Sequence, residues 1–330
     1  EQLNSLSAEN VGALETADIA SITTPILSSF TQIANFNSQQ IKALTNAQVR
    51  ALSVTQLQSL STDQYASLTT NEISNFSATQ VANFTTAGIA ALSSAQLQAI
   101  PSSSVVSLDL SSLSTDQISA LTTKQVSALS ATKLNNLSAI SLSALNGAAM
   151  GAITSTVLSA ISTDQISNLS TAQISALSSL QIQSLTTAQL NAMSADQIAS
   201  ISVSGISALT ATQITGLTAA IDLLAGLSTT QIPALSTANI ALLTGNQLNA
   251  LSTTQINSLS ATQAKALTGS QLTALTTENV GALSTTAIAN LSTTAISTVS
   301  STQLQNLTTL QLQGLSTSAV KALTTAQLNA

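Results

Sequence analysis

The chain has 330 residues, of which 44% are hydrophobic, 5% are charged and 2% are aromatic, and it contains no Cys, His or Trp. These absences exclude zinc and haem sites that need Cys or His, thiol nucleophiles and His-based catalytic triads. Six basic residues against twelve acidic ones, with a net charge of −6, leave no basic patch for nucleic acid or anionic lipid. We therefore expect no enzyme, no cofactor and no nucleic-acid partner.

Large apolar residues recur every eight residues along the chain, which marks an internal repeat. The series that keep this step run from Leu6 to Phe30, Leu44 to Leu108, Leu113 to Leu217 and Leu227 to Leu323. We predict one continuous array over residues 1–330, with register shifts near 31–36, 108–113 and 218–227. We expect each shift to be absorbed as a loop or a bulged coil; the alternatives are a bend, a contact site between rods and, for 218–226, a longer helix.

The repeating octad carries two apolar positions, the first and the sixth. It reads Leu, Ser/Thr, Thr/Ser, any residue, Gln, Ile/Leu/Val, any residue and Ala/Ser/Asn, as in residues 251–258. On an unbroken helix eight residues advance about 80° past two turns, so the apolar stripe would wind around the axis. On one strand the first and sixth positions would point to opposite faces. The pattern therefore predicts that the backbone turns once in every octad.

The polar positions predict a short helix between these turns. Position two is nearly always Ser, Thr, Asn or Asp, and position five is most often Gln. Ser or Thr followed three residues later by Gln is a capping box, in which each side chain bonds the backbone N–H of the other residue. The apolar residues at positions one and six then form the hydrophobic staple of the same helix start.

The few charges agree with this helix direction, because anions favour helix N-termini and cations favour C-termini. Glu72 replaces the capping Gln of its octad. The aspartates at position four are Asp63, Asp116, Asp164 and Asp196. The basic residues at position seven are Lys42, Arg50, Lys265 and Lys321.

A helix of about six residues cannot persist alone, so the octads must stack to share a buried core. We predict an all-α solenoid of very short capped helices; the number of octads per coil stays open. A β-solenoid with stacked Asn or Gln ladders is the alternative, although it leaves the capping box unexplained. Pro233 at a seventh position removes a helical hydrogen bond, so we expect its helix to end early.

The repeat explains the motifs that in other proteins would indicate a catalytic, metal-binding or glycosylation site. We therefore assign no catalytic, cofactor-binding or metal-binding residue. The carboxylates form no pair at catalytic spacing and no EF-hand loop. Asn-x-Ser/Thr sequons arise where an eighth-position Asn precedes the next octad, at Asn75, Asn83, Asn136, Asn168, Asn290 and Asn306. The aromatic residues lie at core positions, namely Phe30, Phe36, Phe76, Phe84 and Tyr65.

Two further expectations concern the membrane and the two ends of the array. Polar residues interrupt every apolar run well before the roughly 18 to 20 residues that a membrane helix needs, so we expect no membrane insertion. The octad pattern runs to both ends, so we expect a piece of a longer array, or a subunit whose ends are covered by neighbours.

Runs such as Leu227–Ile232 and Leu185–Leu190 resemble the Leu-Thr-Thr-x-Gln-Ile arrays of very large, repetitive, secreted surface proteins of Gram-negative bacteria, often classed as adhesins. The resemblance covers essentially the whole chain and implies an extracellular or cell-surface location with a structural or adhesive role. No functional residue carries over from it. The calcium-binding Gly-Gly-x-Gly-x-Asp nonapeptide of many such proteins is missing from this chain, which argues against calcium-dependent folding.

We therefore predict a structural repeat protein that forms, or stacks into, an extracellular filament or surface fibre. Low charge favours this self-association, because little repulsion keeps the molecules apart. The alternative is an adhesin stalk or binding module that presents its Ser/Thr rows to glycan or ice.

Overall fold

The computed structural model describes residues 2–217 and 223–329. It divides into two compact units, an N-terminal unit of residues 1–157 and a C-terminal unit of residues 158–330. The described residues contain α-helices of four to six residues and a few 3-10 helices of three or four residues, and they contain no strand. The predicted all-α solenoid is confirmed, and the β-solenoid alternative is wrong.

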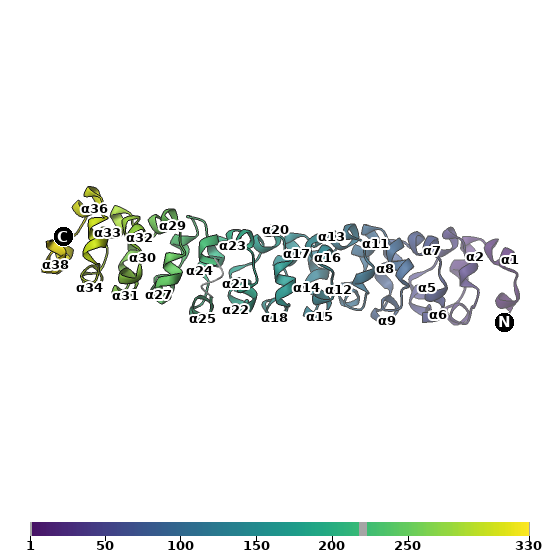
Figure 1. The fold of residues 1–330 in the computed structure, drawn as a ribbon. Coiled ribbons are helices and arrows are strands. Elements are labelled where there is room, and N and C mark those ends of the chain that lie inside the picture. Colours follow the sequence, from purple (N-terminus) through teal and green to yellow (C-terminus); the bar gives the residue numbers. More distant parts are fainter. Residues whose placement is uncertain (1, 218–222, 330) are drawn as a thin grey trace. The chain divides into compact units, whose positions relative to one another are not determined.

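Each coil of the solenoid contains three helices. Among the described elements, the pairs with substantial contacts all join a helix to the third one along the chain, which lies in the next coil. The helices of each unit therefore stack in three columns, and successive coils lie side by side (Figure 1). This spacing settles the number of octads per coil that the sequence left open.

Three columns of helices build the N-terminal unit. The first contains η1 (Gln2–Ser5), α3 (Thr24–Ser28), α5 (Asn46–Ala51), α8 (Thr70–Asn75), α11 (Ser94–Ala99), α13 (Thr115–Ser119) and α16 (Ala139–Ala144). The second contains α1 (Ala8–Gly12), η2 (Ile33–Asn35), α6 (Val54–Ser59), α9 (Ala78–Val81), α12 (Ser102–Val105), α14 (Thr123–Ser127) and α17 (Gly147–Gly151). The third contains α2 (Thr16–Ser21), α4 (Ser38–Lys42), α7 (Thr62–Ser67), α10 (Thr86–Ala91), η3 (Leu110–Ser112) and α15 (Ala131–Asn135). The boundary between the units falls inside α18 (Ser155–Ser159).

The C-terminal unit repeats the pattern. Its first column contains α19 (Thr163–Ser167), α22 (Thr187–Asn191), α25 (Ala211–Thr215), α27 (Thr237–Leu242), α30 (Ala261–Ala266), α33 (Thr285–Ala289) and α36 (Thr309–Gln313). The second contains α20 (Thr171–Ser175), α23 (Ala195–Ala199), α26 (Leu223–Gly226), α28 (Gly245–Asn249), α31 (Gly269–Ala274), α34 (Thr293–Ile296) and α37 (Thr317–Ala322). The third contains α21 (Ser179–Ser184), α24 (Val203–Ser207), η4 (Ile232–Ala234), α29 (Thr253–Asn257), α32 (Thr277–Gly281), α35 (Ser301–Gln305) and α38 (Thr325–Leu328).

The capping box starts most of these helices, as predicted. In α29 the Ser252 hydroxyl accepts from the N–H of Gln255 at 3.3 Å, and the Gln255 side-chain oxygen accepts from the N–H of Ser252 at 2.7 Å. Many helices end at the first residue of the next octad, which we call the anchor, because the backbone becomes extended there. Leu52, with φ −62° and ψ 129°, is an example. The anchor and the following N-cap residue together form the turn that the octad pattern required.

The aspartates at position four and the basic residues at position seven lie at the helix ends that the dipole argument predicted. The four aspartates at position four lie in the first turns of α7, α13, α19 and α23. The basic residues at position seven lie in the last turns of α4, α5, α30 and α37.

The core consists of the side chains at the first and sixth positions of the octads, as predicted. Sixth-position residues such as Ile73 and Ile256 are fully buried, and anchors such as Leu251 are nearly so. The five aromatic residues are buried in the N-terminal unit, where Tyr65 and Phe84 meet edge to face at 5.3 Å between ring centroids.

The first two register shifts coincide with 3-10 helices, η2 and η3. A 3-10 helix rises about 2.0 Å per residue against 1.5 Å for an α-helix, so three residues cover the length of about four. This lets shortened octads fill their places in the coil. The third shift falls partly on residues 218–222, which lie outside the described residues. Whether residues 1–330 form one continuous array stays a prediction.

The octad of Pro233 departs further from the repeat than expected. We predicted a helix that ends early, but a turn at Thr229–Gln231 leads directly into the 3-10 helix η4. Proline has no N–H for an α-helical bond, whereas Ala234 still donates to the carbonyl of Gln231 at 3.0 Å.

Candidate functional site

Glutamines at position five form the most regular polar feature of the structure, and they join one coil to the next. The side-chain oxygen of Gln80 accepts from the N–H of Ser77 at 2.9 Å, which completes the capping box. Its amide nitrogen donates to the carbonyls of Val49 at 2.9 Å and Leu52 at 3.0 Å, at the end of α5 in the preceding coil. We call this arrangement a glutamine clamp.

The clamp recurs in both units. Its two acceptors lie 28 and 31 residues before the glutamine where the coil has full length, as for Gln80. They lie 26 and 29 or 25 and 28 residues before it where a shortened octad falls in between, as for Gln48 and Gln125. Clamps in the N-terminal unit include those of Gln40, Gln48, Gln56, Gln64, Gln96, Gln117 and Gln125. Clamps in the C-terminal unit include those of Gln189, Gln197, Gln213, Gln255, Gln263, Gln271, Gln303 and Gln327. In each of these clamps the carboxamide has its oxygen and both N–H groups paired or placed against acceptors, which is what burial of a polar group requires.

The sequence reasoning gave these glutamines a capping role only and missed the bond between coils. A signal for it was present. Capping needs only an acceptor, and a helix N-terminus favours a negative charge, so Glu would serve at least as well as Gln. The strong preference for Gln at position five implies that the amide N–H groups also have partners.

Tyr65 replaces a clamp where position five is Gly88. Its hydroxyl donates to the carbonyl of Leu57 at 2.9 Å and accepts from the N–H of Thr85 at 3.4 Å. Those are two of the three backbone groups that a glutamine at position 88 would bind; by the same spacing the third is the carbonyl of Leu60. A Cβ atom on Gly88 would lie 2.4 Å from the Tyr65 ring, so the glycine makes room for the tyrosine. Burial raises the pKa of the Tyr65 phenol, which therefore stays a neutral donor.

Other residues at position five keep part of the clamp or lack it. The ammonium group of Lys133 donates to the carbonyl of Leu108 at 2.7 Å, and the amide of Asn239 donates to the carbonyl of Leu209 at 2.8 Å. In α16, α17 and α18, position five is taken by Ser141, Ala149 and Val157, none of which carries a side-chain N–H.

A second set of bonds between coils lies on the outside, at position seven. The amide of Asn249 donates to the carbonyl of Ala274 at 2.8 Å, and that of Asn257 donates to Ala282 at 3.1 Å, each 25 residues ahead. Sequon asparagines also bond the backbone: Asn83 donates to Thr79 and Asn290 to Thr286, both within their own helices. These contacts support the packing explanation of the sequons.

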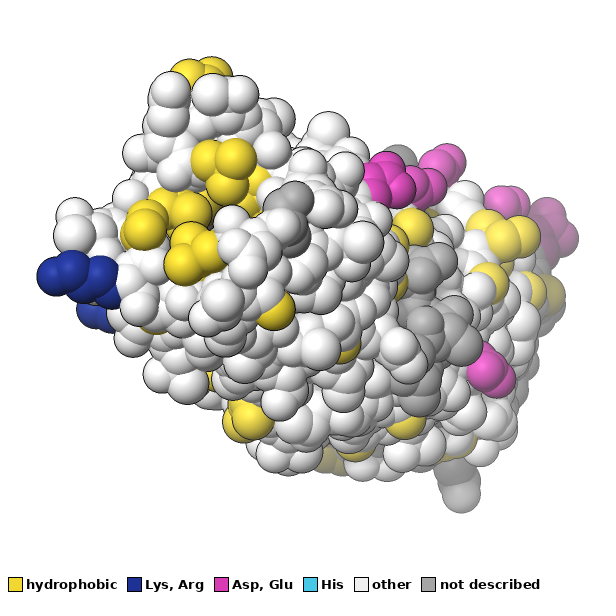
Figure 2. Space-filling model, turned by 60° about the vertical axis from the view of Figure 1, so that its left-hand side comes forward, with side chains coloured by type: hydrophobic (Ala, Val, Ile, Leu, Met, Phe, Trp, Pro, Cys, Tyr) yellow, Lys and Arg dark blue, Asp and Glu magenta, His cyan; other side chains and the backbone are white. Residues whose placement is uncertain are grey.

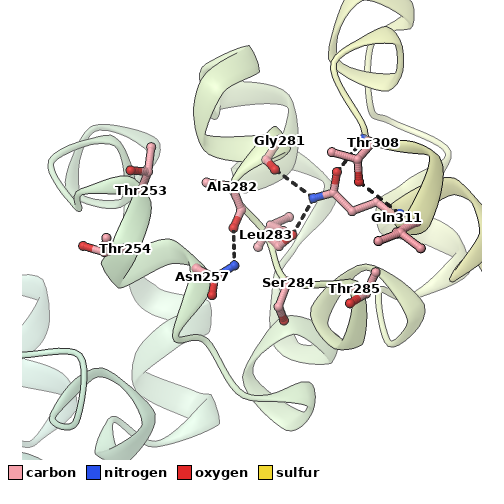
Figure 3. A pocket seen from close by; sticks show the side chains of 11 residues that line it. Thr253, Thr254, Asn257, Gly281, Ala282, Leu283, Ser284, Thr285, Thr308 and Gln311 are labelled. Carbon is pink, nitrogen blue, oxygen red and sulfur yellow. Dashed lines mark hydrogen bonds between the residues drawn. The ribbon is translucent and has the colours of Figure 1, made fainter.

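An open groove of about 640 Å³ lies on the C-terminal unit, between α29, residues 281–285 and α36 (Figure 3). Its lining residues are uncharged, and its polar groups are mainly hydroxyls. The hydroxyl-bearing residues are Thr253, Thr254, Ser284, Thr285 and Thr308. The side chain of Leu310, which also lines the groove, is 70% exposed. Such a lining can exchange hydrogen bonds with a neutral, hydroxyl-rich ligand.

The chain has few charged residues, and exposed apolar side chains gather at one place on the C-terminal unit. On the face shown in Figure 2, charged side chains are few, and hydrophobic side chains form one larger group among smaller scattered ones. Exposed apolar side chains gather on α36, α37 and α38, where Leu312, Val320 and Leu328 are 44%, 44% and 61% exposed. In the preceding coil the equivalent Ile288 and Ile296 are at most 1% exposed, because the next coil covers them.

The described part of the chain holds no cluster of three or more His, Cys, Asp or Glu residues that could bind a metal ion. No helix within the described ranges has both the length and the apolar character needed to cross a bilayer.

Comparison with known proteins identifies the repeat. Residues 33–70, 150–187, 169–203 and 224–253 match the family model of the ALTTAQ repeat. The hexapeptide stands in full at residues 322–327, across the junction of two octads. A search of the curated proteins found no match. The chain therefore contains repeats of a recognised family.

Proposed function

We propose that this array of ALTTAQ-type octads is a structural protein that forms, or stacks into, an extracellular filament or surface fibre, without catalysis. The observation that carries the proposal is the clamp, because most octads use their polar residues to join one coil to the next. A protein whose repeating polar residues are used to stack its own coils has the properties of a scaffold.

The coil faces supply a route to assembly. The apolar side chains on α36, α37 and α38 are equivalent to ones that the following coil covers on α33 and α34, so a coil of the same kind, from the same or from another molecule, fits this face. The near-neutral sides of the solenoid add little electrostatic repulsion between neighbouring molecules. The extracellular location rests on the resemblance of the octads to secreted surface arrays.

Electron microscopy and sedimentation of the purified chain test the proposal. We expect filaments or higher oligomers that grow with protein concentration, whereas dispersed monomers at high concentration would contradict it. The Val320→Lys variant places a charge on the exposed face of α37 and should weaken end-on assembly. Ser318→Lys adds the same charge to an exposed site on the same helix and serves as the matched control.

The second candidate function is glycan or ice binding, and the groove of Figure 3 favours it. Glycan arrays and an ice-recrystallisation assay test this function directly. Thr285→Val removes a hydroxyl from the groove and should reduce any activity found. Thr309→Val changes the same octad position outside the groove and should leave the activity unchanged. No signal in either assay would leave the structural function alone.

A further inference from the structure

Glu72 in α8 occupies position five of its octad, where the neighbouring coils have a clamp glutamine. Its side chain is buried, with 2% of its surface exposed. One carboxylate oxygen, Oε2, accepts from the N–H of Thr69 at 2.5 Å and so completes the capping box, as the side-chain oxygen of glutamine does elsewhere. The capping function predicted for Glu72 is therefore confirmed.

The other carboxylate oxygen takes the place of the glutamine amide nitrogen. Because the carboxyl and carboxamide groups are both planar and have the same shape, fixing Oε2 on Thr69 directs Oε1 toward the preceding coil. By the 31- and 28-residue spacing of the clamps of Gln64 and Gln80, the backbone acceptors there are the carbonyls of Ile41 and Leu44. Oε1 is buried and has no hydrogen-bond partner among the described residues. When Glu72 is ionised, Oε1 can only accept a hydrogen bond, and the backbone carbonyls that it faces can also only accept one.

A single proton resolves this mismatch. The protonated carboxyl group has one O–H donor, and at Oε1 that donor reaches the carbonyls that a glutamine amide binds. We propose that Glu72 is a proton-dependent clamp, which joins α8 to the end of α4 when its carboxyl group is protonated and releases that contact when the group ionises. The inference concerns contacts within the N-terminal unit and does not depend on the assembly proposed above.

The charged groups around Glu72 are few. Lys42, in the last turn of α4, is the cation whose field reaches it. Helix α5, which packs on α8, carries Arg50, whose guanidinium donates to the side-chain oxygen of Asn75 at 2.6 Å. Helix α11, which packs on the other side, has no ionisable side chain, and Asp63 in the adjacent α7 is exposed.

Burial raises the pKa of Glu72 above its ordinary value of about 4.5, and this effect exceeds the lowering by the Thr69 hydrogen bonds and by Lys42. A carboxyl group whose pKa is higher in the folded than in the unfolded chain binds its proton more tightly when folded. Its stabilising contribution is therefore complete below the ordinary pKa and is lost as the pH rises through the raised value.

Amide hydrogen exchange of the full chain across this pH range tests the proposal. Protection factors, corrected for intrinsic exchange rates, are compared for peptides from α4, α5 and α8. In the wild-type protein we expect protection to fall as the pH rises, by about tenfold for each unit by which the pKa is raised. Glu72→Gln restores the regular clamp and should keep full protection at every pH.

Three further variants make the test specific. Asp63→Asn removes an exposed carboxylate next to this coil and should preserve the wild-type pH profile. Lys42→Gln removes the nearby cation and should move the loss of protection to higher pH. Gln80→Glu places a carboxylate in a regular clamp and should create the same pH dependence in α5 and α9. Parallel profiles for wild type and Glu72→Gln, or a pH-independent loss in Gln80→Glu, would overturn the proposal.

Discussion

Helix α6 offers a direct measurement of one glutamine clamp, because it carries two glutamines in different settings. Gln56 is 5% exposed; its oxygen accepts from the N–H of Ser53 at 2.8 Å, and its amide donates to the carbonyls of Leu27 at 2.7 Å and Phe30 at 2.8 Å. Gln58, two residues later, is exposed. Methionine has a similar length and no strong hydrogen-bonding group, so Gln56→Met removes the clamp with little loss of volume.

The expected cost follows from the three bonds that are lost. A typical hydrogen bond contributes about 0.5 to 1.5 kcal/mol, and a buried partner left unpaired costs about 1 to 3 kcal/mol. The carbonyl of Leu27 keeps its bond from the N–H of Phe30, which limits the damage there. We therefore expect Gln56→Met to lower the free energy of opening this coil by about 2 to 4 kcal/mol. Gln58→Met should stay within about 0.5 kcal/mol of the wild type.

Native-state hydrogen exchange on peptides from α3 and α6 measures the local effect, and urea unfolding measures the global one. Because each coil of a solenoid contacts only its neighbours, the loss of protection should concentrate in the coils of α3 and α6. Equal effects of the two methionine variants would refute the clamp as a stabilising contact between coils. Gln56→Glu keeps the capping acceptor but removes both donors, so it separates the two functions of the side chain.

Three other substitutions or measurements address the exceptions to the clamp. Gly88→Ala should lower the free energy of unfolding by about 1 to 3 kcal/mol through the clash with the Tyr65 ring. Tyr65→Leu combined with Gly88→Gln rebuilds a regular clamp, and urea unfolding in a double-mutant cycle should show a favourable coupling energy between the two changes. Lys133→Gln should preserve stability and Lys133→Met should lose about 1 to 2 kcal/mol, since only the former can donate to the carbonyl of Leu108. Amides of α16 and α17, whose octads lack a clamp donor, should exchange faster than those of α6 and α7, which carry the clamps of Gln56 and Gln64. Equal protection would show that packing alone holds the coils together.

The parts of the fold that local chemistry determines could be predicted from the sequence. A capping box involves residues three apart, so the start of α29 can be read from Ser252 and Gln255 alone. The core could be predicted for the same reason, because the two apolar positions, the anchor and the sixth, lie close together within each octad. The structure of the Pro233 octad was only partly predictable, because the missing N–H is local but the shape of the neighbouring coil, which selects a 3-10 helix, is not.

The coil itself could not be predicted, because it depends on the angle that two extended residues make between helices. A change of a few tens of degrees in the angle between successive helices decides whether two or three helices complete a coil. The clamp depends on that angle too, since Gln80 and Leu52 are 28 residues apart and meet only when three octads complete a coil. The same applies to Tyr65 and Gly88, whose complementarity appears only when α7 and α10 lie in adjacent coils.

The low charge of the chain has a physical cause in the clamp. A capping Glu at every position five would satisfy the helix start, but its second oxygen would face backbone carbonyls and a buried charge would be added with each octad, at a large desolvation cost. Glutamine keeps the acceptor, supplies two donors and stays neutral at every pH. Glu72 shows the difference, because it keeps the bond to Thr69 while its other oxygen has no described partner. Stacking therefore disfavours carboxylates in the interior of each coil, and the four aspartates at position four lie in exposed first turns instead.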